Sequence, residues 1–289
     1  MKNTSFILML LCCFSLAINA KNTEVYPTNW WVGMKTNSIQ LLIRSTDDSF
    51  TTDKININYP GIAINKTYSF PNSKYIAVDI TISPETAAGD VIIELNQKSG
   101  KQKIKWPIYN RRAGNGTQYA QGVTSSDFIE LIMVDRFSNG DTANDKIKGM
   151  RDQSLNRKEM YDRHGGDLQG VINNLDYIQG LGVTALWFTP VMENDMEKRT
   201  EHGYAITNHY KIDQRYGGDA MYEKLSNQLH SRGMKLIFDA VYNHIGSFHF
   251  LELDPPANDW VHRCQNILKP IIEKSRFLIL TEQNLTKRK

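Results

Sequence analysis

The sequence is short of cysteine. Only three of its 289 residues are cysteines, and two of them, Cys12 and Cys13, lie in an apolar N-terminal segment. If that segment is removed, Cys264 remains alone and cannot form an internal disulfide. A disulfide-stapled fold is therefore excluded. Stability must come from buried apolar side chains and, where ligands allow it, from a metal.

The sequence also lacks a strong charge of either sign. Its formal net charge is +3 at pH 7, and its basic residues form no dense stripe interleaved with aromatic residues. Nucleic-acid recognition relies on such a surface, so no nucleic-acid partner is expected. The G-x-S-x-G turn of serine hydrolases does not occur. His244 and His249 match no helical zinc-binding pair, and no cysteine lies beside them.

No apolar run reaches the roughly 20 residues that a transmembrane helix needs. The longest apolar run is in the N-terminal segment "MKNTSFILMLLCCFSLAINA", which has a basic start and small residues before Ala20. This pattern predicts a secretory signal over residues 1–20, hence export to the periplasm or the medium and no membrane attachment after cleavage. A buried N-terminal helix is the alternative, although the polar residues that follow disfavour it.

Residues 21–112 contain short alternating runs separated by turn-forming residues, such as "IQLLIRS", "KYIAVDITIS" and "GDVIIELNQ". Period-two spacing with a turn about every ten residues predicts an antiparallel β-sandwich. Trp30 and Trp31 are neighbours on one of its strands and should point to opposite faces. We expect both in the core, with a sugar-stacking platform as the alternative.

Residues 113–127 are rich in Gly, Ser, Thr and Asn and have no apolar periodicity, which predicts a linker. Strand-like and helix-like patterns then alternate: "FIELIMV", "LQGVINNLDYIQGLG", "VTALWF", "DAMYEKLSNQLHSRG" and "MKLIF". Continuous apolar strands between amphipathic helices predict parallel β/α units over residues 128–263, and thus an α/β fold.

Polar residues follow each predicted strand, in "DRFSNGD", "TPVMEND" and "DAVYNH". This is the edge at which parallel β/α folds bind ligands. Two further segments, "NGDTAND" and "HGGD", place oxygen ligands around glycines, as calcium requires: Asn139, Asp141, Asn144, Asp145, Gly165 and Asp167. From the residues alone, a calcium site and an Asx-rich turn without metal are equally supported.

Three linked segments resemble the α-amylase family of glycoside hydrolases. "GGDLQGVINNLDYIQGLGVTALWFTPV" is similar to its first barrel helix and second strand, "HGYAITNHYKIDQRYGG" to the segment before the third strand, and "DAVYNH" to the motif that ends the third strand. The preceding sandwich and "DRFSNGDTAND" narrow the resemblance to the neopullulanase and cyclomaltodextrinase branch. It implies a (β/α)8 TIM barrel after the sandwich, and hydrolysis of α-glucans such as starch, pullulan or cyclodextrin.

The resemblance also implies roles for individual residues. Asp239 matches an aspartate that orders the cleavage subsite, and His244 matches a histidine that hydrogen-bonds the glucose there. Tyr204 matches the aromatic platform under that glucose, with His202 beside it. The calcium ligands of this branch match Asn139, Asp141, Asn144, Asp145, the carbonyl of Gly165, and Asp167. Because relatives of this branch often dimerise through the sandwich, a homodimer is a further expectation.

A complete catalytic pair is missing from the predicted site. Retaining glycosidases need two carboxyl groups about 5 Å apart, and in this family they follow the fourth and fifth barrel strands. Only three strands are predicted before Arg263, and residues 264–289 contain no glycine or aspartate and fit no β/α unit. We therefore expect a premature end, such as a frameshift, and an incomplete, inactive barrel. A genuine short variant, acting as a non-catalytic glucan-binding or dimerising protein, is the alternative.

Overall fold

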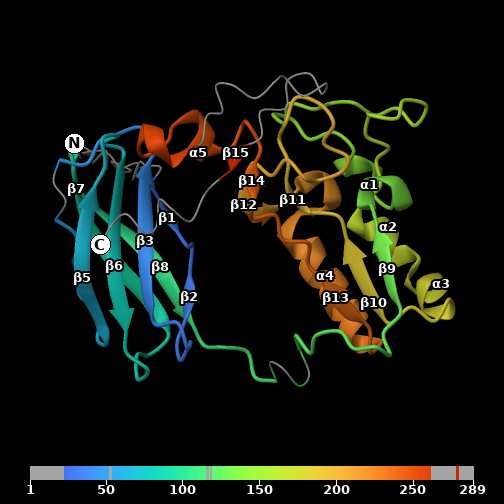
Figure 1. Cartoon of the computed structure of the whole chain (residues 1–289), viewed down its shortest axis with the longest axis horizontal. Helices are drawn as coiled ribbons and strands as arrows, with labels where there is room; N and C mark the ends of the chain where they lie inside the picture. The colour runs from blue at the N-terminus through green and yellow to red at the C-terminus, as the bar shows by residue number, and fades with distance from the viewer. Residues whose placement is uncertain (1–22, 52–53, 115–116, 118, 262–277, 280–289) are drawn as a thin grey trace, which may run out of the picture.

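A computed structural model describes residues 23–51, 54–114, 117, 119–261 and 278–279 of the chain. The predicted signal segment and nearly all of the atypical tail lie outside these residues. Within the described part, no helix is long and apolar enough to cross a membrane. Figure 1 shows two units side by side, one of β-strands and one of strands and helices, joined by the segment that follows β8.

The first unit is a sandwich of two four-stranded sheets. One sheet has the order β1 (Thr23–Tyr26), β3 (Ser38–Ser45), β6 (Tyr75–Ile82), β5 (Ile62–Ser69). The other has the order β2 (Trp30–Trp31), β8 (Gly100–Tyr109), β7 (Gly89–Gln97), β4 (Asn56–Ile57). In β3 and β7 alternate residues face the shared core, as Val91, Ile93 and Leu95 do in β7. The alternating pattern predicts this arrangement.

Strand β2 departs from the predicted sandwich in two ways. It pairs with the end of β8 in parallel, with Trp30 opposite Ile108 and Trp31 opposite Tyr109, although every other strand pair of the sandwich is antiparallel. Trp30 packs against the core, whereas Trp31 is 40% exposed. The expectation that both tryptophans are core residues is thus wrong for Trp31, because the pleat turns its side chain to the outer face.

The second unit is built on a parallel sheet with the order β9 (Ile129–Ile132), β10 (Ala185–Phe188), β13 (Lys235–Ile237). Helices α2 (Leu168–Asn173) and α3 (Leu175–Gly180) connect the first two strands, and α4 (Gly218–Ser231) precedes the third. The strands that the pattern predicts are therefore adjacent and parallel. The eight-stranded barrel remains a prediction, since the described residues contain these three barrel-type strands.

The single helix predicted over residues 168–182 is instead two short helices that meet at Asn174. The side-chain amide of Asn174 donates to the carbonyl oxygen of Gly170 at 2.7 Å. Asparagine side chains compete with the backbone for hydrogen bonds and thus favour helix ends. A hydrophobic period alone does not reveal this break.

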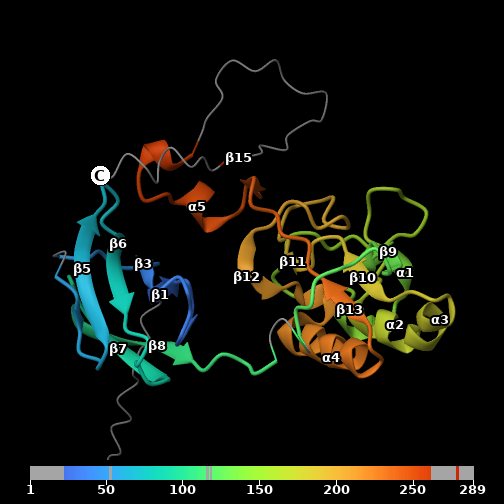
Figure 2. The same cartoon turned by 60° about the horizontal axis from the view of Figure 1, so that its bottom comes forward.

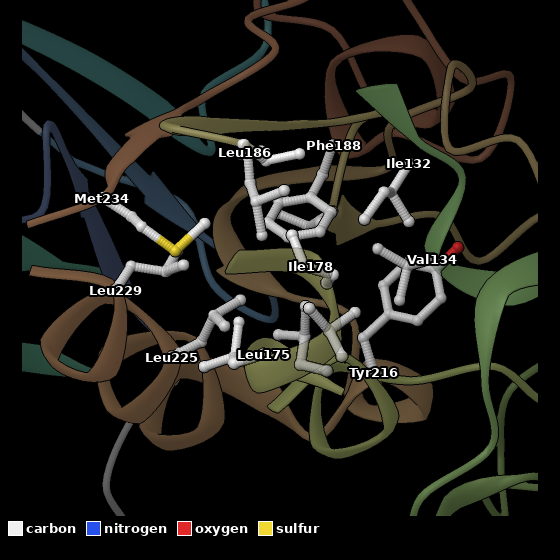
Figure 3. Packing of buried hydrophobic residues seen from close by; sticks show 14 of the residues in the cluster. Ile132, Val134, Leu175, Ile178, Leu186, Phe188, Tyr216, Leu225, Leu229 and Met234 are labelled. Carbon is white, nitrogen blue, oxygen red and sulfur yellow. The ribbon is translucent and has the colours of Figure 1, made fainter. Parts of the chain in front are cut away.

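The helices bury one face of the parallel sheet. Figure 3 shows Leu186 and Phe188 of β10 packed against Leu175 and Ile178 of α3 and Leu225 of α4. Fully burying each such side chain contributes about 1.5–3 kcal/mol. The opposite face stays open: Leu131 is 52% exposed and Trp187 38%.

Short elements fill the loops at the carboxyl ends of these strands. In chain order they are α1 (Val134–Phe137), η1 (Thr142–Asn144), β11 (Met192–Glu193), β12 (Asn208–Ile212), η2 (Gln214–Tyr216), β14 (His244–Ile245), α5 (Phe250–Leu253) and η3 (Asn258–Trp260). Strand β15 (Leu278–Ile279) pairs with β14. In Figures 1 and 2, α5 lies between the two units.

The segment around α5 contacts the sandwich directly. The side-chain amide of Asn72 donates to Asp254 Oδ1 at 2.7 Å and to the carbonyl oxygen of Pro255 at 3.0 Å. The Tyr75 hydroxyl donates to the carbonyl oxygen of Asp254 at 2.6 Å, and the ring of Phe70 meets that of Trp260 edge-on at 5.6 Å. The chain after β14 therefore joins the β/α unit to the sandwich.

Candidate functional site

The carboxylate of Asp239 lies just beyond β13 and receives two hydrogen bonds on one oxygen. The Tyr204 hydroxyl donates to Asp239 Oδ2 at 3.0 Å, and the indole nitrogen of Trp187 donates to the same oxygen at 3.2 Å. Trp187 lies on β10, and Tyr204 belongs to the loop before β12. Elements far apart in the sequence thus meet at the carboxyl edge of the sheet, as expected for a site in a parallel β/α unit.

The two predicted histidines join this group through Tyr204. His244 donates from Nε2 to the carbonyl oxygen of Tyr204 at 2.8 Å, and the backbone N–H of Tyr204 donates to His202 Nδ1 at 2.9 Å. The rings of His202 and Tyr204 stack with centroids 5.9 Å apart. All four residues predicted to bind substrate therefore lie together.

Gly203 makes this turn possible. It has a positive φ of 83°, and a Cβ there would lie 2.0 Å from the carbonyl oxygen of Pro190. A side chain here would be strained in this backbone conformation and would clash with Pro190, so the position favours glycine. The loop is thereby held against the end of β10, which fixes the flanking rings of His202 and Tyr204.

The environment keeps two of these side chains neutral. Burial raises the pKa of Tyr204, and its hydrogen bond to the Asp239 carboxylate adds to the shift. Burial also lowers the pKa of His202, helped by the charge of Arg199 and by His244. His202 therefore accepts the Tyr204 N–H as a neutral ring. The site thus offers a neutral phenol, a neutral imidazole and one carboxylate.

Sequence reasoning missed Trp187. The pattern "VTALWF" identifies a buried strand, but periodicity within a strand does not specify its neighbours' register. Trp187 pairs with Leu131 on one side and Ile237 on the other, so its indole stands on the open face of the sheet. The usable signal was a tryptophan, an aromatic residue with a polar N–H, in a strand-like run two residues before the polar loop.

A buried ionic network lies behind the site, and it too was not predicted. Asp135, 1% exposed, accepts the backbone N–H of His164 at 2.8 Å and pairs with Arg163 at 3.4 Å. Arg163 and Arg215 both donate to Thr200 Oγ1, at 3.3 and 3.2 Å. This network ties the segment before Gly165 to the loop that carries His202 and Tyr204.

Arg215 completes its own buried pair with Asp213 at 2.7 Å. Burial by itself would raise the pKa of Asp213, but the hydrogen bonds and charge of Arg215 outweigh it and hold this pKa below its usual range. Both charges are therefore retained inside the protein. Removing one partner of such a pair typically costs about 3–5 kcal/mol, because it leaves the other charge uncompensated.

The six predicted calcium ligands lie in two neighbouring segments. Asn139 Nδ2 donates to Asp145 Oδ1 at 2.7 Å, and a Cβ on Gly165 would lie 2.6 Å from that same oxygen. Asp167, fully buried, accepts the N–H of Asp141 at 2.8 Å on Oδ2 and caps α2 through Oδ1. The structure therefore brings these loops together.

Two buried side-chain oxygens of this cluster have no hydrogen-bond donor among the described residues, Asn139 Oδ1 and Asn144 Oδ1. An unsatisfied buried oxygen is costly, and a cation would satisfy both. No three His, Cys, Asp or Glu side chains gather as a metal site in the described part of the chain. Amide and carbonyl oxygens form half of this ligand set, and the two unsatisfied amide oxygens indicate that the cluster fits a cation.

In the described part of the chain, Asp239 accepts hydrogen bonds from Tyr204 and Trp187. Of the acidic residues that follow it, Asp254 is hydrogen-bonded to Asn72 and lies 3.6 Å from Lys74 of the sandwich. Glu252 is on α5 and Asp259 is on η3. Glu273 and Glu282 lie outside the described residues. The expectation that the catalytic pair is incomplete therefore stays a prediction.

Two segments of the chain match known families. Residues 24–112 match the N-terminal domain of cyclomaltodextrinase, and residues 131–267 match the catalytic domain of alpha amylase. The relatives include neopullulanase 2 of Thermoactinomyces vulgaris, 38% identical over 123 residues, which cover 42% of this chain and 20% of that protein.

Two other relatives differ in cellular location. The periplasmic alpha-amylase of Escherichia coli K12 is 35% identical over 129 residues, covering 41% of this chain and 19% of that protein. The intracellular maltogenic amylase of Bacillus subtilis 168 is 37% identical over 120 residues, covering 40% of this chain and 19% of that protein. The chain thus spans about a fifth of the length of these relatives.

Proposed function

Because the chain belongs to the α-amylase family, with an N-terminal domain of the cyclomaltodextrinase type, we propose that it is part of an α-glucan hydrolase. The substrates would be starch-derived oligosaccharides, pullulan or cyclodextrins. The observation that carries this proposal is the group formed by Tyr204, Asp239 and Trp187 at the carboxyl edge of the parallel sheet.

In this proposal Tyr204, Asp239 and Trp187 bind and orient one glucose unit. The Tyr204 ring supplies an apolar face for the sugar C–H groups, and the remaining lone pairs of Asp239 accept sugar hydroxyls. The hydrogen bonds from Trp187 and Tyr204 hold the Asp239 carboxylate in one orientation. An ionised carboxylate beside the anomeric carbon would stabilise an oxocarbenium-like transition state.

Bond cleavage needs more than these residues provide. A retaining mechanism uses a nucleophile and an acid/base about 5 Å apart, and we propose that this chain supplies neither. It would therefore contribute the sugar-binding part of the site. The alternative function, a non-catalytic glucan-binding protein, uses the same residues and is favoured by the single carboxylate at the site.

We also propose that Asn139, Asp141, Asn144, Asp145, the carbonyl oxygen of Gly165, and Asp167 hold one calcium ion. The unsatisfied oxygens of Asn139 and Asn144 support this proposal. The ion would order the loop after β9 rather than take part in chemistry. The bound ion would take the place of the Asn139 amide hydrogen as the partner of Asp145 Oδ1.

Sugar binding by the whole chain tests the proposed function. Maltotriose titrated into the protein should change tryptophan fluorescence, because Trp187 contacts Asp239. Tyr204→Ala and Asp239→Asn should each weaken binding about tenfold or more, the loss of about 1.4 kcal/mol. Tyr177→Ala is the matched control, because Tyr177 is a 64% exposed tyrosine on α3. Equal affinities of all four proteins would refute the proposed site.

Retention and hydrolysis separate the two candidate functions. A non-catalytic glucan-binding protein would be folded and retained on a starch or cyclodextrin resin. If the chain is instead part of a hydrolase, it should become active only when the missing carboxylates are supplied. Without the rest of the enzyme, its open apolar sheet face should promote aggregation. Sequencing of the gene through the Arg263 codon would show whether α-amylase motifs continue in another reading frame.

For location we propose export, supported by the apolar segment before Ala20 and by the name of the periplasmic relative. The intracellular relative shows that the family itself does not settle the compartment. N-terminal sequencing of protein from the periplasm or medium should begin at Lys21. Recovery of the intact N-terminus in the cytoplasm would contradict export. We also propose that the protein forms a homodimer, and its molecular mass measured by sedimentation tests this.

A further inference from the structure

A pair of histidines lies where α5 meets the β/α unit. His249 is buried and is the N-cap residue of α5, where its Nδ1 accepts the Leu251 N–H at 3.1 Å. His209 is on β12, and its Nδ1 lies 3.4 Å from His249 Nε2. The other ring nitrogen of His209 lies 3.2 Å from the carbonyl oxygen of Val241. Every ring nitrogen of this histidine pair therefore has a hydrogen-bond partner.

These partners determine where the protons of the histidine pair are. Because Nδ1 of His249 accepts a backbone N–H, its neutral ring carries the proton on Nε2. The carbonyl of Val241 can only accept, so His209 donates to it from Nε2, and its Nδ1 accepts the Nε2–H of His249. A further proton would have to bind a nitrogen that already accepts a hydrogen bond. Protonation of either ring therefore breaks one of these bonds.

The basic groups around the histidine pair also oppose a positive charge on it. The ring of Phe250 stacks on that of His249 with centroids 4.5 Å apart, and the Arg44 guanidinium already lies over the Phe250 ring, 4.9 Å from its centroid. His244 on β14 is a further basic neighbour of His209. A charged His249 would therefore add a second cation beside Phe250.

The acidic groups of the adjoining elements do not compensate for this. Glu24 on β1 pairs with Arg44 at 3.1 Å, and Asp254 after α5 is hydrogen-bonded to Asn72. Glu252 on α5 has one buried oxygen without a hydrogen-bond donor among the described residues. Burial nevertheless lowers the pKa of His249 to about 3, and burial also lowers the pKa of the other histidine of the pair.

The histidine pair supports a contact between the two units, which have α5 between them in Figure 2. Phe250, the first residue of α5, stacks on Tyr26 of β1 with centroids 5.0 Å apart. The Tyr26 ring also meets that of Tyr210 on β12, again with centroids 5.0 Å apart. Side chains of the sandwich thus pack against the N-terminus of α5, which His249 caps.

We propose that His209 and His249 form a pH-dependent switch that holds α5 against the β/α unit at neutral pH and releases it in acid. A bound proton removes either the N-cap of α5 or the hydrogen bond between the two rings. Phe250 then loses its fixed position against Tyr26, so the contact with the sandwich loosens as well. Because an exposed histidine binds a proton below about pH 6.5, the contact is complete above this pH and weakens as the pH falls toward 3.

Hydrogen exchange of the whole 289-residue protein at pH 7.5 and pH 5.0, corrected for intrinsic exchange rates, tests the switch. The protection of amides in residues 250–254 should fall about thirtyfold, which is the effect of one proton over the roughly 1.5 pH units below 6.5. The amides of β7 should be better protected than those of α5 at both pH values. This difference would show that α5 opens while the sandwich stays folded.

His249→Asn is the matched variant, because asparagine is a favoured N-cap residue and does not titrate. It should lose most of the thirtyfold change, and so should His249→Gln, the second variant if the first folds poorly. His230→Gln removes a histidine of α4 and should keep the change seen in the parent protein. The inference is overturned if α5 protection in the parent does not depend on pH or if the His249 variants show the same dependence. Equal protection of α5 and β7 would overturn it too, because the protein would then open as one unit.

Discussion

His249 is a neutral histidine held in the interior next to the sandwich. It is 4% exposed, its Nδ1 accepts the Leu251 N–H at 3.1 Å, and its ring stacks on Phe250 with centroids 4.5 Å apart. Burial lowers its pKa to about 3, with further contributions from His209 and Arg44. Burial likewise lowers the pKa of His209, whose Nδ1 lies 3.4 Å from His249 Nε2.

This burial predicts a loss of stability in acid. The unfolded chain binds a proton at this histidine below about pH 6.5, whereas the folded protein does so only near pH 3. The contribution of His249 to the free energy of unfolding is therefore fully present above about pH 6.5. It falls as the pH is lowered toward 3, by up to about 1.4 kcal/mol per pH unit. Urea midpoints between pH 7.5 and 4.5 measure this slope.

His249→Gln is the matched variant, because its amide oxygen can still accept the Leu251 N–H but does not titrate. The variant should show a clearly shallower dependence of the urea midpoint on pH. Parallel pH profiles of the parent and the variant would mean that other groups cause the acid sensitivity.

At the scale of single residues, the sequence indicated Tyr204 and Asp239 but not the contact between Trp187 and Asp239. Motif resemblance identifies residues with a shared role, wherever they lie in the fold. The hydrogen bond from Trp187 depends on how β10 and β13 are aligned, which is a tertiary property. The same holds for Arg163 and Thr200, which are far apart in sequence and ordinary in composition.

At the scale of elements, the loops after β9 carry the most specific prediction. Gly165 has a φ of 83°, and an alanine Cβ there would clash with Asp145 Oδ1. Gly165→Ala should therefore cost about 1–3 kcal/mol in backbone strain and also displace a calcium ligand. In the parent protein, calcium at about 100 times its Kd should add about 2.7 kcal/mol of stability. Melting temperatures with calcium and with EDTA measure both effects.

Gly149→Ala controls for strain alone. Gly149 has a φ of 97°, and a Cβ there would meet nothing within 4 Å. This variant should lose stability but keep the calcium-induced shift, which Gly165→Ala should lose. A parent protein that shows no melting shift with calcium would reduce the cluster to an Asx-rich turn.

The segment around α5 depends on Asn72. Its side chain donates to Asp254 and Pro255 and accepts the N–H of Lys74 at 3.2 Å. Asn72→Ala should cost about 1–3 kcal/mol because it leaves partly buried groups unpaired, and should expose the segment to proteases. Asn65→Ala is the control, since Asn65 makes one exposed side-chain hydrogen bond, to Thr81. Equal proteolysis of both variants would mean that other contacts hold the segment.

Elements with a strong period were the easiest to predict. Strand β6 and helix α4 follow directly from "KYIAVDITIS" and "DAMYEKLSNQLHSRG". Strand β2 was less accessible, because a two-residue strand carries no period and its parallel pairing with β8 is set by the path of the chain. The docking of α5 against Asn72 joins residues about 180 positions apart, which no local pattern encodes.

At the scale of the whole molecule, the two units differ in how completely they bury their apolar residues. The sandwich encloses its core between two sheets. The parallel sheet buries one face under α2, α3 and α4, and its other face exposes Leu131 and Trp187. That open face carries Trp187 and leads to Asp239, so whatever covers it would also enclose the candidate site.

The final prediction concerns the activity of the 289-residue polypeptide. Asp239 can stabilise positive charge on a sugar, but it is a single carboxylate, and Asp254, which follows it in the sequence, is bound to the sandwich. General acid–base catalysis alone contributes about 10²–10⁴-fold in rate, and covalent catalysis requires a nucleophile in addition. We therefore expect no measurable release of reducing sugar from starch, pullulan or cyclodextrin, even where the protein binds them. Release that Asp239→Asn abolishes would contradict this expectation and would place a catalytic carboxylate among Glu252, Asp259, Glu273 and Glu282, the remaining acidic residues after Asp239.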